Sequence, residues 1–216
     1  MRSTESFVGA LPWYFDVISP FAYLQLEWLR REHPEVLLDP KPVLLGPILN
    51  HIGQLGPAEI PAKREFTYRY VVWRAQELGI PLRFPPRHPF NSLAAMRLIV
   101  AAGGSIEAVQ SVFRHAWMHG RALDEPDELL ALGQVLGVED VESRIADAGV
   151  KQSLKASTEA AIASGIYGVP TLRVHGDYYF GQDATSFALS VLTDPTRLQA
   201  PEFAGLGAIP IGVTRK

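Results

Sequence analysis

The sequence predicts an α/β fold in which a small sheet is interrupted by a large, all-helical insertion. Short apolar segments typical of strands occur near both ends of the chain, whereas residues 47–149 carry helical periodicity broken by Gly and Pro. A chain of 216 residues is long for one compact core and short for two independent domains. One core with a substantial insertion therefore fits the length.

The first strand and the first helix are predicted close to the N-terminus. An apolar strand is expected from Leu11 to Val17, followed by a helix from Pro20 to about Glu32. Ser19 is the expected N-cap, because its oxygen can accept a backbone N–H that has no partner in the helix. Proline is favoured at the next position, where no N–H is needed. The helix ends before Pro34, which cannot continue it.

Ser19 is also a candidate functional residue. A hydroxyl at the positive end of a helix macrodipole, surrounded by free N–H groups, favours a nearby anion such as a thiolate, phosphate or carboxylate. The alternative is that Ser19 only caps the helix, which is the usual role of a Ser-Pro pair. A second segment, around Pro170, bears on this choice.

A second strand and the insertion follow the first helix. The strand is expected over about Val36 to Leu45, where it completes a right-handed β-α-β unit and enters Gly46-Pro47. Within the insertion the periodicity, the Gly breaks and the Pro residues predict five helices. Their approximate ranges are 62–78, 91–102, 105–119, 125–136 and 139–147.

The chain is expected to return to the sheet through a helix at about 150–164 and the segment 168–172 (Gly-Val-Pro-Thr-Leu). Pro170 at the start of a hairpin strand predicts a cis Val169–Pro170 bond, with the N–H and C=O of Val169 available to a ligand. A last helix is expected at about Ala184 to Leu192, with Asp183 as a candidate N-cap. The tail that follows has no clear periodicity, and the alternatives for it are packing on the surface, covering the site or assisting a dimer.

Composition excludes several classes of protein. The chain is 47% hydrophobic with a mean hydropathy near zero, as in ordinary globular proteins. A net charge of −3 gives no electrostatic reason to expect a nucleic-acid partner. No apolar run approaches the roughly 20 residues of a membrane span, and the N-terminus lacks the apolar stretch of a signal peptide. We therefore expect no membrane association and a cytoplasmic location.

The chain contains no cysteine. It cannot supply a disulfide, a redox couple, a thiolate nucleophile or a zinc–thiolate site, so any sulfur chemistry needs a cofactor that brings the sulfur. Among the six histidines, His115 and His119 have a spacing that can bind zinc on a helix, but no third ligand is evident. We expect no metal site.

Six segments, in this order, carry a resemblance to a known family: FDVISPFAYL (15–24), PVLLGPI (42–48), PAEIPAKREF (57–66), PLRFP (81–85), GVPTL (168–172) and FGQD (180–183). Together they resemble the 2-hydroxychromene-2-carboxylate isomerases and kappa-class glutathione transferases of the thioredoxin superfamily. The resemblance implies a thioredoxin-like domain with a large helical insertion, as in DsbA-like proteins. The implied division is 8–46 with 150–194 for the thioredoxin-like domain, 47–149 for the insertion and 195–216 for the tail.

The resemblance implies glutathione as the cofactor. Ser19 matches the active-site serine, whose hydroxyl hydrogen-bonds the glutathione sulfur, and Val169, before Pro170, matches the residue whose backbone pairs with the cysteinyl part. Asp183, with Thr185 and the N–H groups of Ala184 and Thr185, matches the site for the γ-glutamyl end, where a carboxylate can hold an ammonium.

Two further positions depart from the family pattern. Asn50 and Gln54 stand where the family commonly has a Lys and an Asn, and we expect them to contact the cofactor by hydrogen bonds. The Lys-to-Asn difference removes a positive charge, which would matter most for an acidic substrate.

The expected function is that of a glutathione-dependent isomerase of the 2-hydroxychromene-2-carboxylate isomerase type. It would act on a small aromatic or conjugated substrate, as in aromatic catabolism, by reversible addition of a thiolate, and by resemblance it would be a homodimer. One alternative is a kappa-like glutathione S-transferase that keeps the thioether product. An alternative of another class is a redox-inactive thioredoxin-like binding or chaperone module, which would not bind glutathione.

Overall fold

The four strands form one mixed sheet with the order β2-β1-β3-β4. The computed structural model describes residues 9–213, so the expected domain start at residue 8 and the last three tail residues lie outside the described part. The strands are β1 (Leu11–Phe15), β2 (Leu38–Pro42), β3 (Thr171–Val174) and β4 (Asp177–Phe180). β1 pairs in parallel with β2 and antiparallel with β3, and β3 with β4 forms the expected hairpin.

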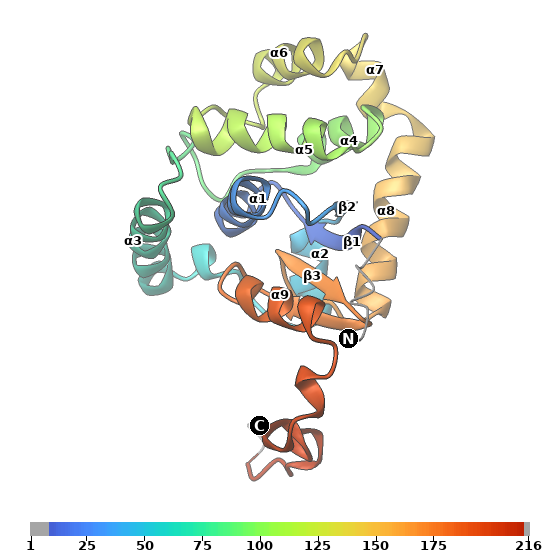
Figure 1. The fold of residues 1–216 in the computed structure, drawn as a ribbon. Helices are drawn as coiled ribbons and strands as arrows, with labels where there is room; N and C mark the ends of the chain where they lie inside the picture. The colour runs from blue at the N-terminus through green and yellow to red at the C-terminus, as the bar shows by residue number, and fades with distance from the viewer. Residues whose placement is uncertain (1–8, 214–216) are drawn as a thin grey trace.

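Nine α-helices lie within residues 9–213 (Figure 1). They are α1 (Pro20–Glu32), α2 (Leu45–His51), α3 (Pro61–Leu78), α4 (Leu93–Ala101), α5 (Ile106–Phe113), α6 (Pro126–Leu136), α7 (Val141–Ala146), α8 (Ala148–Ala163) and α9 (Thr185–Thr193). Shorter turns occur at Pro57–Glu59, Arg114–Met118, Arg197–Gln199, Pro201–Phe203 and Leu206–Ala208. The α/β class with many helices between β2 and β3 is confirmed.

Two strand boundaries differ from the sequence prediction, and one helix was not expected. β1 ends at Phe15, two residues early, because the Asp16 side chain accepts the N–H of Ile18 and so starts a turn. β2 is confined to Leu38–Pro42 and contains two prolines, which an edge strand tolerates because one side of it needs no ladder bonds. α2 was not predicted, because Gly46-Pro47 resembles a break in the chain.

Two helices in the second half also differ from the prediction. The helix expected over 105–119 is α5 up to Phe113, and it continues as a π-helical turn, Arg114–Met118. The last helix begins at Thr185, and its N-cap position is occupied by Ala184 without a side-chain hydrogen bond. Asp183 as the N-cap was therefore wrong.

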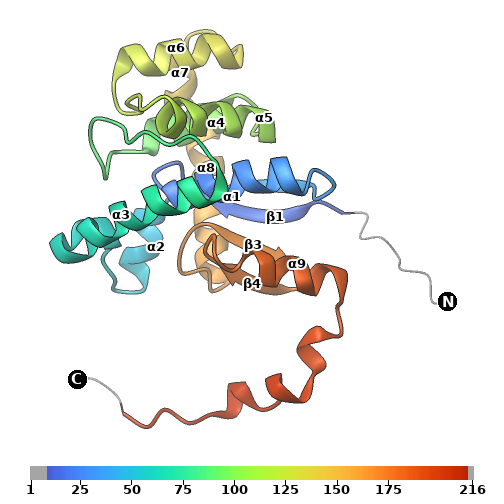
Figure 2. The same ribbon diagram turned by 60° about the vertical axis from the view of Figure 1, so that its left-hand side comes forward.

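The core is built around β1. Trp13 and Phe15 are fully buried, their rings stack with centroids 4.8 Å apart, and Phe113 of α5 packs against both. A smaller apolar cluster joins α2 and α8 to the segment before β3; it contains Val43, Ile48, Ala161, Ile166 and Val169. Helices α4 to α7 gather at one end of the molecule, and α9 packs on β3 and β4 (Figures 1 and 2). Both clusters fix the carboxyl end of β1, where Ser19 lies.

The segment after α9 leaves the body of the molecule in both views (Figures 1 and 2). Phe203 stacks on Phe187 of α9, with ring centroids 6.1 Å apart. Beyond this contact, Ile209, Ile211 and Val213 are 67%, 84% and 86% exposed. The last described part of the tail therefore presents apolar side chains to water.

Candidate functional site

Ser19 lies at the junction of β1 and α1. It is the N-cap of α1, as predicted: its Oγ accepts the N–H of Ala22 at 3.3 Å, and Pro20 occupies the first helical position. Its own N–H donates to the carbonyl of Asp16 at 3.0 Å. Among residues 9–213, no acceptor takes the proton of the Ser19 hydroxyl. The site therefore offers one O–H donor beside the positive end of a 13-residue helix.

Asp16 fixes the turn that leads to Ser19. Its buried carboxylate accepts the N–H of Ile18 at 3.1 Å and the N–H of Leu45, at the start of α2, at 2.9 Å. Burial raises the pKa of Asp16, although hydrogen bonds from Leu45, Ile18 and Ser92 oppose the shift. The carboxyl thus ties the Ser19 turn to α2.

Two residues between β2 and β3 form hydrogen bonds with backbone carbonyls of the same turn. Trp117 donates its indole N–H to the carbonyl of Val17 at 2.8 Å, and His88 Nε2 lies 2.9 Å from the carbonyl oxygen of Ile18. Sequence reasoning missed both residues, since a Trp in a helix and a His in a Pro-rich loop carry no signal of a partner 100 or 70 positions away.

The Val169–Pro170 bond is cis, as predicted. Tyr14 pairs with Thr171 in the sheet, so Pro170 lies at the end of β1 from which the Ser19 turn departs. The carbonyl of Pro170 accepts the N–H of Gly181 at 2.8 Å. In the described part of the chain, neither the N–H nor the C=O of Val169 has a hydrogen-bond partner.

Gln25 joins α1 to the loop before α9. Its side chain is fully buried, and its Nε2 donates to the carbonyl of Gly181 at 3.2 Å and to Thr185 Oγ1 at 2.8 Å. Its Oε1 accepts the indole N–H of Trp13 at 2.7 Å. Because Gly181 also bonds Pro170, this amide links the Ser19 helix with the Pro170 loop. A sequence pattern does not reveal it, because Gln25 is one of several polar residues in α1.

Three predicted site residues lie where the loop before α9 meets the first residue of that helix, Thr185. Asp183 is exposed, and Ala184 precedes the first turn of α9. Thr185 is buried, and its hydroxyl donates to the carbonyl of Gln182 while accepting from Gln25. The side chain of Thr185 thus stabilises the loop. Of the two polar side chains, only that of Asp183 faces solvent.

A cation not identified from the sequence lies beside this loop. Arg74 of α3 donates from Nε to Gln182 Oε1 at 2.9 Å, and Gln182 itself is buried. α3 therefore reaches from α1 to the loop that carries Asp183. Sequence reasoning missed Arg74, since α3 carries several basic residues and no pattern distinguishes this one.

Asn50 and Gln54 lie apart from these contacts. Asn50 is exposed in the last turn of α2, and Gln54 is exposed in the loop that follows. The backbone N–H of Gln54 donates to the carbonyl of Leu49 at 2.9 Å. No hydrogen bond within residues 9–213 joins either side chain to Ser19, Val169 or Asp183.

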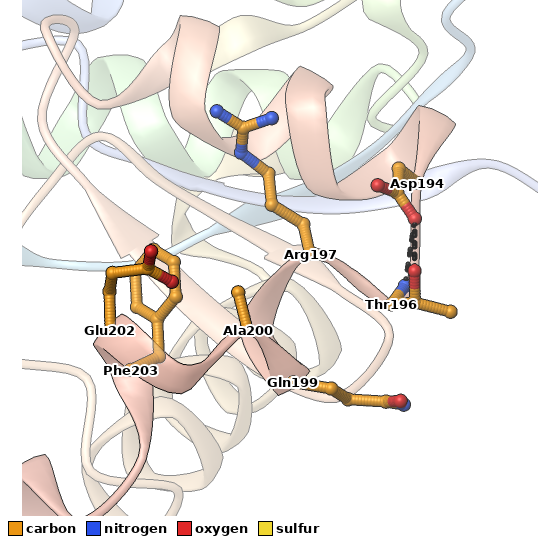
Figure 3. A pocket seen from close by; sticks show the side chains of 7 residues that line it. All are labelled: Asp194, Thr196, Arg197, Gln199, Ala200, Glu202 and Phe203. Carbon is orange, nitrogen blue, oxygen red and sulfur yellow. Dashed lines mark hydrogen bonds between the residues drawn. The ribbon is translucent and has the colours of Figure 1, made fainter.

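Two surface hollows lie elsewhere. One, drawn in Figure 3, is formed by the tail after α9 and lined by Asp194, Thr196, Arg197, Gln199, Ala200, Glu202 and Phe203. The other has a volume of about 480 Å³ and lies between α1 and α5. Neither is lined by Ser19, Val169 or Asp183. We therefore assign the candidate site from the hydrogen-bonding groups around Ser19.

Residues 9–213 contain neither a metal-binding cluster nor a helix that could span a membrane. No three His, Asp or Glu side chains gather in an arrangement that could hold a metal ion. His115 instead lies 2.9 Å from Glu128, which also contacts Arg121. No helix in the same residues combines the length and apolar character of a membrane span.

A serine at a helix N-terminus beside a cis-proline loop, on a mixed four-stranded sheet with many helices, defines a thioredoxin-like fold. The chain belongs to the DsbA-like thioredoxin domain family, whose model matches residues 10–193. The tail from residue 194 lies outside this match.

The chain is similar to two kinds of enzyme, kappa-class glutathione transferases and 2-hydroxychromene-2-carboxylate isomerases. The chain is 27% identical over 205 residues to glutathione S-transferase kappa 2 of Caenorhabditis elegans, covering 84% of this chain and 91% of the relative. It is 28% identical over 179 residues to 2-hydroxychromene-2-carboxylate isomerase of Pseudomonas putida, covering 79% and 87%. The solved structure of a 2-hydroxychromene-2-carboxylate isomerase superposes with a TM-score of 0.76 at 24% identity, covering 89% of this chain and 98% of that one.

Proposed function

We propose that this protein is a glutathione-dependent isomerase of the 2-hydroxychromene-2-carboxylate isomerase type. The observation that carries the proposal is the hydroxyl of Ser19 at the N-terminus of α1, a donor that has no acceptor among residues 9–213, in a chain without cysteine. Relatives named as kappa-class transferases and as an isomerase support a glutathione-linked reaction.

The residues present fit glutathione. Its cysteinyl part is a peptide unit, and Val169 has a backbone N–H and C=O that no described residue uses. Its γ-glutamyl end carries an ammonium and a carboxylate, which match the exposed carboxylate of Asp183 and the N–H groups at the start of α9. Val169, Asp183 and Ala184 would therefore hold the cofactor. We keep Thr185 as a proposed contact of the same site, although its backbone N–H donates to the carbonyl of Gln182 at 3.3 Å. We keep Asn50 and Gln54 as proposed hydrogen-bonding contacts at its periphery.

When bound, glutathione supplies a thiolate that adds reversibly to a conjugated carbon of the substrate and is released unchanged. Ser19 donates a hydrogen bond to the sulfur, and the N-terminus of α1 adds a favourable dipole, so both lower the pKa of the thiol. Ser19 is not the nucleophile, because no base in the described part of the chain accepts a hydrogen bond from its hydroxyl. His88, behind the same turn, directs its Nε2 to the carbonyl of Ile18 and not to the Ser19 hydroxyl.

The proposed function extends to the substrate class, the oligomeric state and the cellular location. A small aromatic or conjugated substrate, as in aromatic catabolism, suits addition of a thiolate to a conjugated carbon. We further propose a homodimer, supported by the exposed apolar side chains of Ile209, Ile211 and Val213, and a cytoplasmic location. We retain the division into a thioredoxin-like domain (8–46 and 150–194), a helical insertion (47–149) and a tail (195–216).

The chemistry of the transferase alternative shares every group named above and differs only in the fate of the thioether. The binding or chaperone alternative needs none of them. Titration calorimetry with glutathione tests the proposal: saturable binding is expected, and no detectable heat at millimolar glutathione would contradict it. Analysis of products with a conjugated 2-hydroxychromene-type substrate then distinguishes isomerase from transferase. The isomerase leaves total glutathione constant, whereas the transferase consumes one glutathione per product.

A further inference from the structure

A titratable pair lies directly behind the Ser19 turn. His88 Nε2 is 2.9 Å from the carbonyl oxygen of Ile18, the residue that precedes Ser19. On the other side of the ring, His88 Nδ1 is 2.8 Å from the hydroxyl of Tyr68, a residue of α3. The same hydroxyl is 2.7 Å from the backbone carbonyl of His88. The Ile18–Ser19 peptide is thus connected to α3 through one imidazole and one phenol.

The hydrogen-bonding partners define the tautomer. A carbonyl oxygen can only accept, so His88 Nε2 must carry a proton and donate to Ile18. In the neutral ring Nδ1 is then an acceptor, and the Tyr68 proton is shared between Nδ1 and the His88 carbonyl. In the charged ring Nδ1 would donate to Tyr68, and Tyr68 would donate to the His88 carbonyl. Both charge states therefore keep the hydrogen bond to Ile18 without moving an atom.

Packing restricts the imidazole to this orientation. The rings of Tyr68, Phe84, Phe90 and Trp117 surround it, with centroid distances of 5.4, 6.2, 6.0 and 5.2 Å. Burial lowers the pKa of His88, the hydrogen bond to Ile18 opposes this shift, and the charge of Arg64 adds to it. The ring is thus neutral near pH 7, where it acts through its hydrogen bond and not through charge.

We propose that His88 and Tyr68 form a positioning pair, which fixes the Ile18–Ser19 peptide and thereby the direction in which the Ser19 hydroxyl points. The Ile18 carbonyl and the Ser19 N–H belong to one planar peptide, so a bond that holds the carbonyl also orients the N–H. The Ser19 N–H in turn bonds Asp16, and Ser19 Oγ accepts from Ala22. The inference rests on the proposed function insofar as Ser19 acts on a bound thiolate.

The test compares three variants in the full chain. His88→Phe removes the donor to Ile18 and keeps a ring, His88→Gln retains a neutral N–H donor, and Tyr68→Phe removes only the hydroxyl. The matched control is Tyr23→Phe, which removes a hydroxyl that donates at 2.7 Å to the carbonyl of Pro81, in the same loop as His88. It should lower stability in a comparable way while leaving the backbone N–H of Tyr23, which donates to the carbonyl of Ser19 at 3.3 Å, unchanged.

The first readout is the absorbance of the thiolate of bound glutathione against pH. His88→Phe should reduce the thiolate fraction near pH 7 about 3- to 10-fold, because a misdirected Ser19 hydroxyl stabilises the anion less. Tyr68→Phe should reduce it less, His88→Gln should restore it to within about 2-fold, and the Tyr23→Phe curve should match the wild type. An unchanged curve for His88→Phe, or a shift of equal size in the Tyr23→Phe control, would overturn the proposal.

The second readout needs no cofactor. Amide hydrogen exchange of Ser19 and Ala22 reports their hydrogen bonds to Asp16 and to Ser19 Oγ. Exchange at both should accelerate about 10-fold or more in His88→Phe and remain unchanged in the Tyr23→Phe control. Unchanged protection would refute the positioning role. If the wild type binds no glutathione, the proposed function fails, whereas the exchange measurement still decides the role of the pair.

Discussion

Replacing the buried amide of Gln25 by leucine should destabilise the protein more than most single substitutions. Gln25→Leu keeps a side chain of similar size but removes three hydrogen bonds, those to Trp13, Gly181 and Thr185. Thr185 retains a partner, because its hydroxyl still donates to the carbonyl of Gln182. The indole N–H of Trp13, a fully buried residue, and the Gly181 carbonyl lose the bonds that they make with Gln25.

The magnitude follows from these two groups. A buried donor or acceptor without its partner costs about 1–3 kcal/mol, so two of them cost about 2–6 kcal/mol. The added apolar burial of leucine offsets part of this, which favours the lower half of the range. Since the free energy of unfolding of a domain is about 5–15 kcal/mol, the change is a substantial fraction of the total.

Urea unfolding followed by tryptophan fluorescence measures this cost. The matched control is Gln152→Leu at an exposed position of α8, which should change the free energy of unfolding by no more than about 0.5 kcal/mol. If Gln25→Leu lay within about 1 kcal/mol of the wild type, the amide would not be the link between α1 and the loop before α9.

Three further changes test separate parts of the account. Asp183→Ala should weaken glutathione binding by about 1.5–3 kcal/mol, the range for a charged hydrogen bond, and unchanged affinity in calorimetry would remove Asp183 from the site. Burial raises the pKa of Asp16, so its contribution to stability is fully present below its ordinary pKa near 4 and is lost as pH rises through the raised value. The difference in unfolding free energy between the wild type and Asp16→Asn should therefore fall with rising pH in urea titrations. A difference that stays constant with pH would show that the pKa of Asp16 is not raised. Ile211→Asp should convert the proposed dimer to a monomer in sedimentation analysis, since a charge in an apolar contact is costly; an unchanged dimer would place the interface elsewhere, and a monomeric wild type would refute the dimer.

Much of the fold could be predicted because local rules dominate there. Ser19 caps α1 as expected, since N-cap chemistry depends on a few neighbouring residues. The same local reasoning does not predict α2, because Gly46-Pro47 resembles a break in the chain. Pro47 is the third residue of α2, within the first turn, where its missing N–H costs nothing. Asp183 failed as an N-cap because the loop before α9 is held by Gln25 and Arg74, which lie far away in the sequence.

The candidate site could be predicted only where a motif marks it. The cis bond before Pro170 was expected from the segment around it, and it is present. The groups that hold the Ser19 turn, Trp117 and His88, act across 100 and 70 positions, and each uses a single hydrogen bond to a backbone carbonyl. Hydropathy patterns carry no information about such contacts, because any buried ring satisfies the same pattern.

The central claim is that the Ser19 hydroxyl stabilises a bound thiolate, and the most direct test is the absorbance of that thiolate against pH in the wild type and in Ser19→Ala. The control is Ser105→Ala, which removes another N-cap serine, at α5, whose Oγ accepts the N–H of Ala108 at 3.2 Å. In the wild type and the control, the thiol of bound glutathione should titrate below its ordinary pKa of about 8.5. In Ser19→Ala glutathione should still bind, with the pKa of its thiol raised toward that value. Identical titration curves for the wild type and Ser19→Ala would contradict the claim and reduce Ser19 to a helix cap.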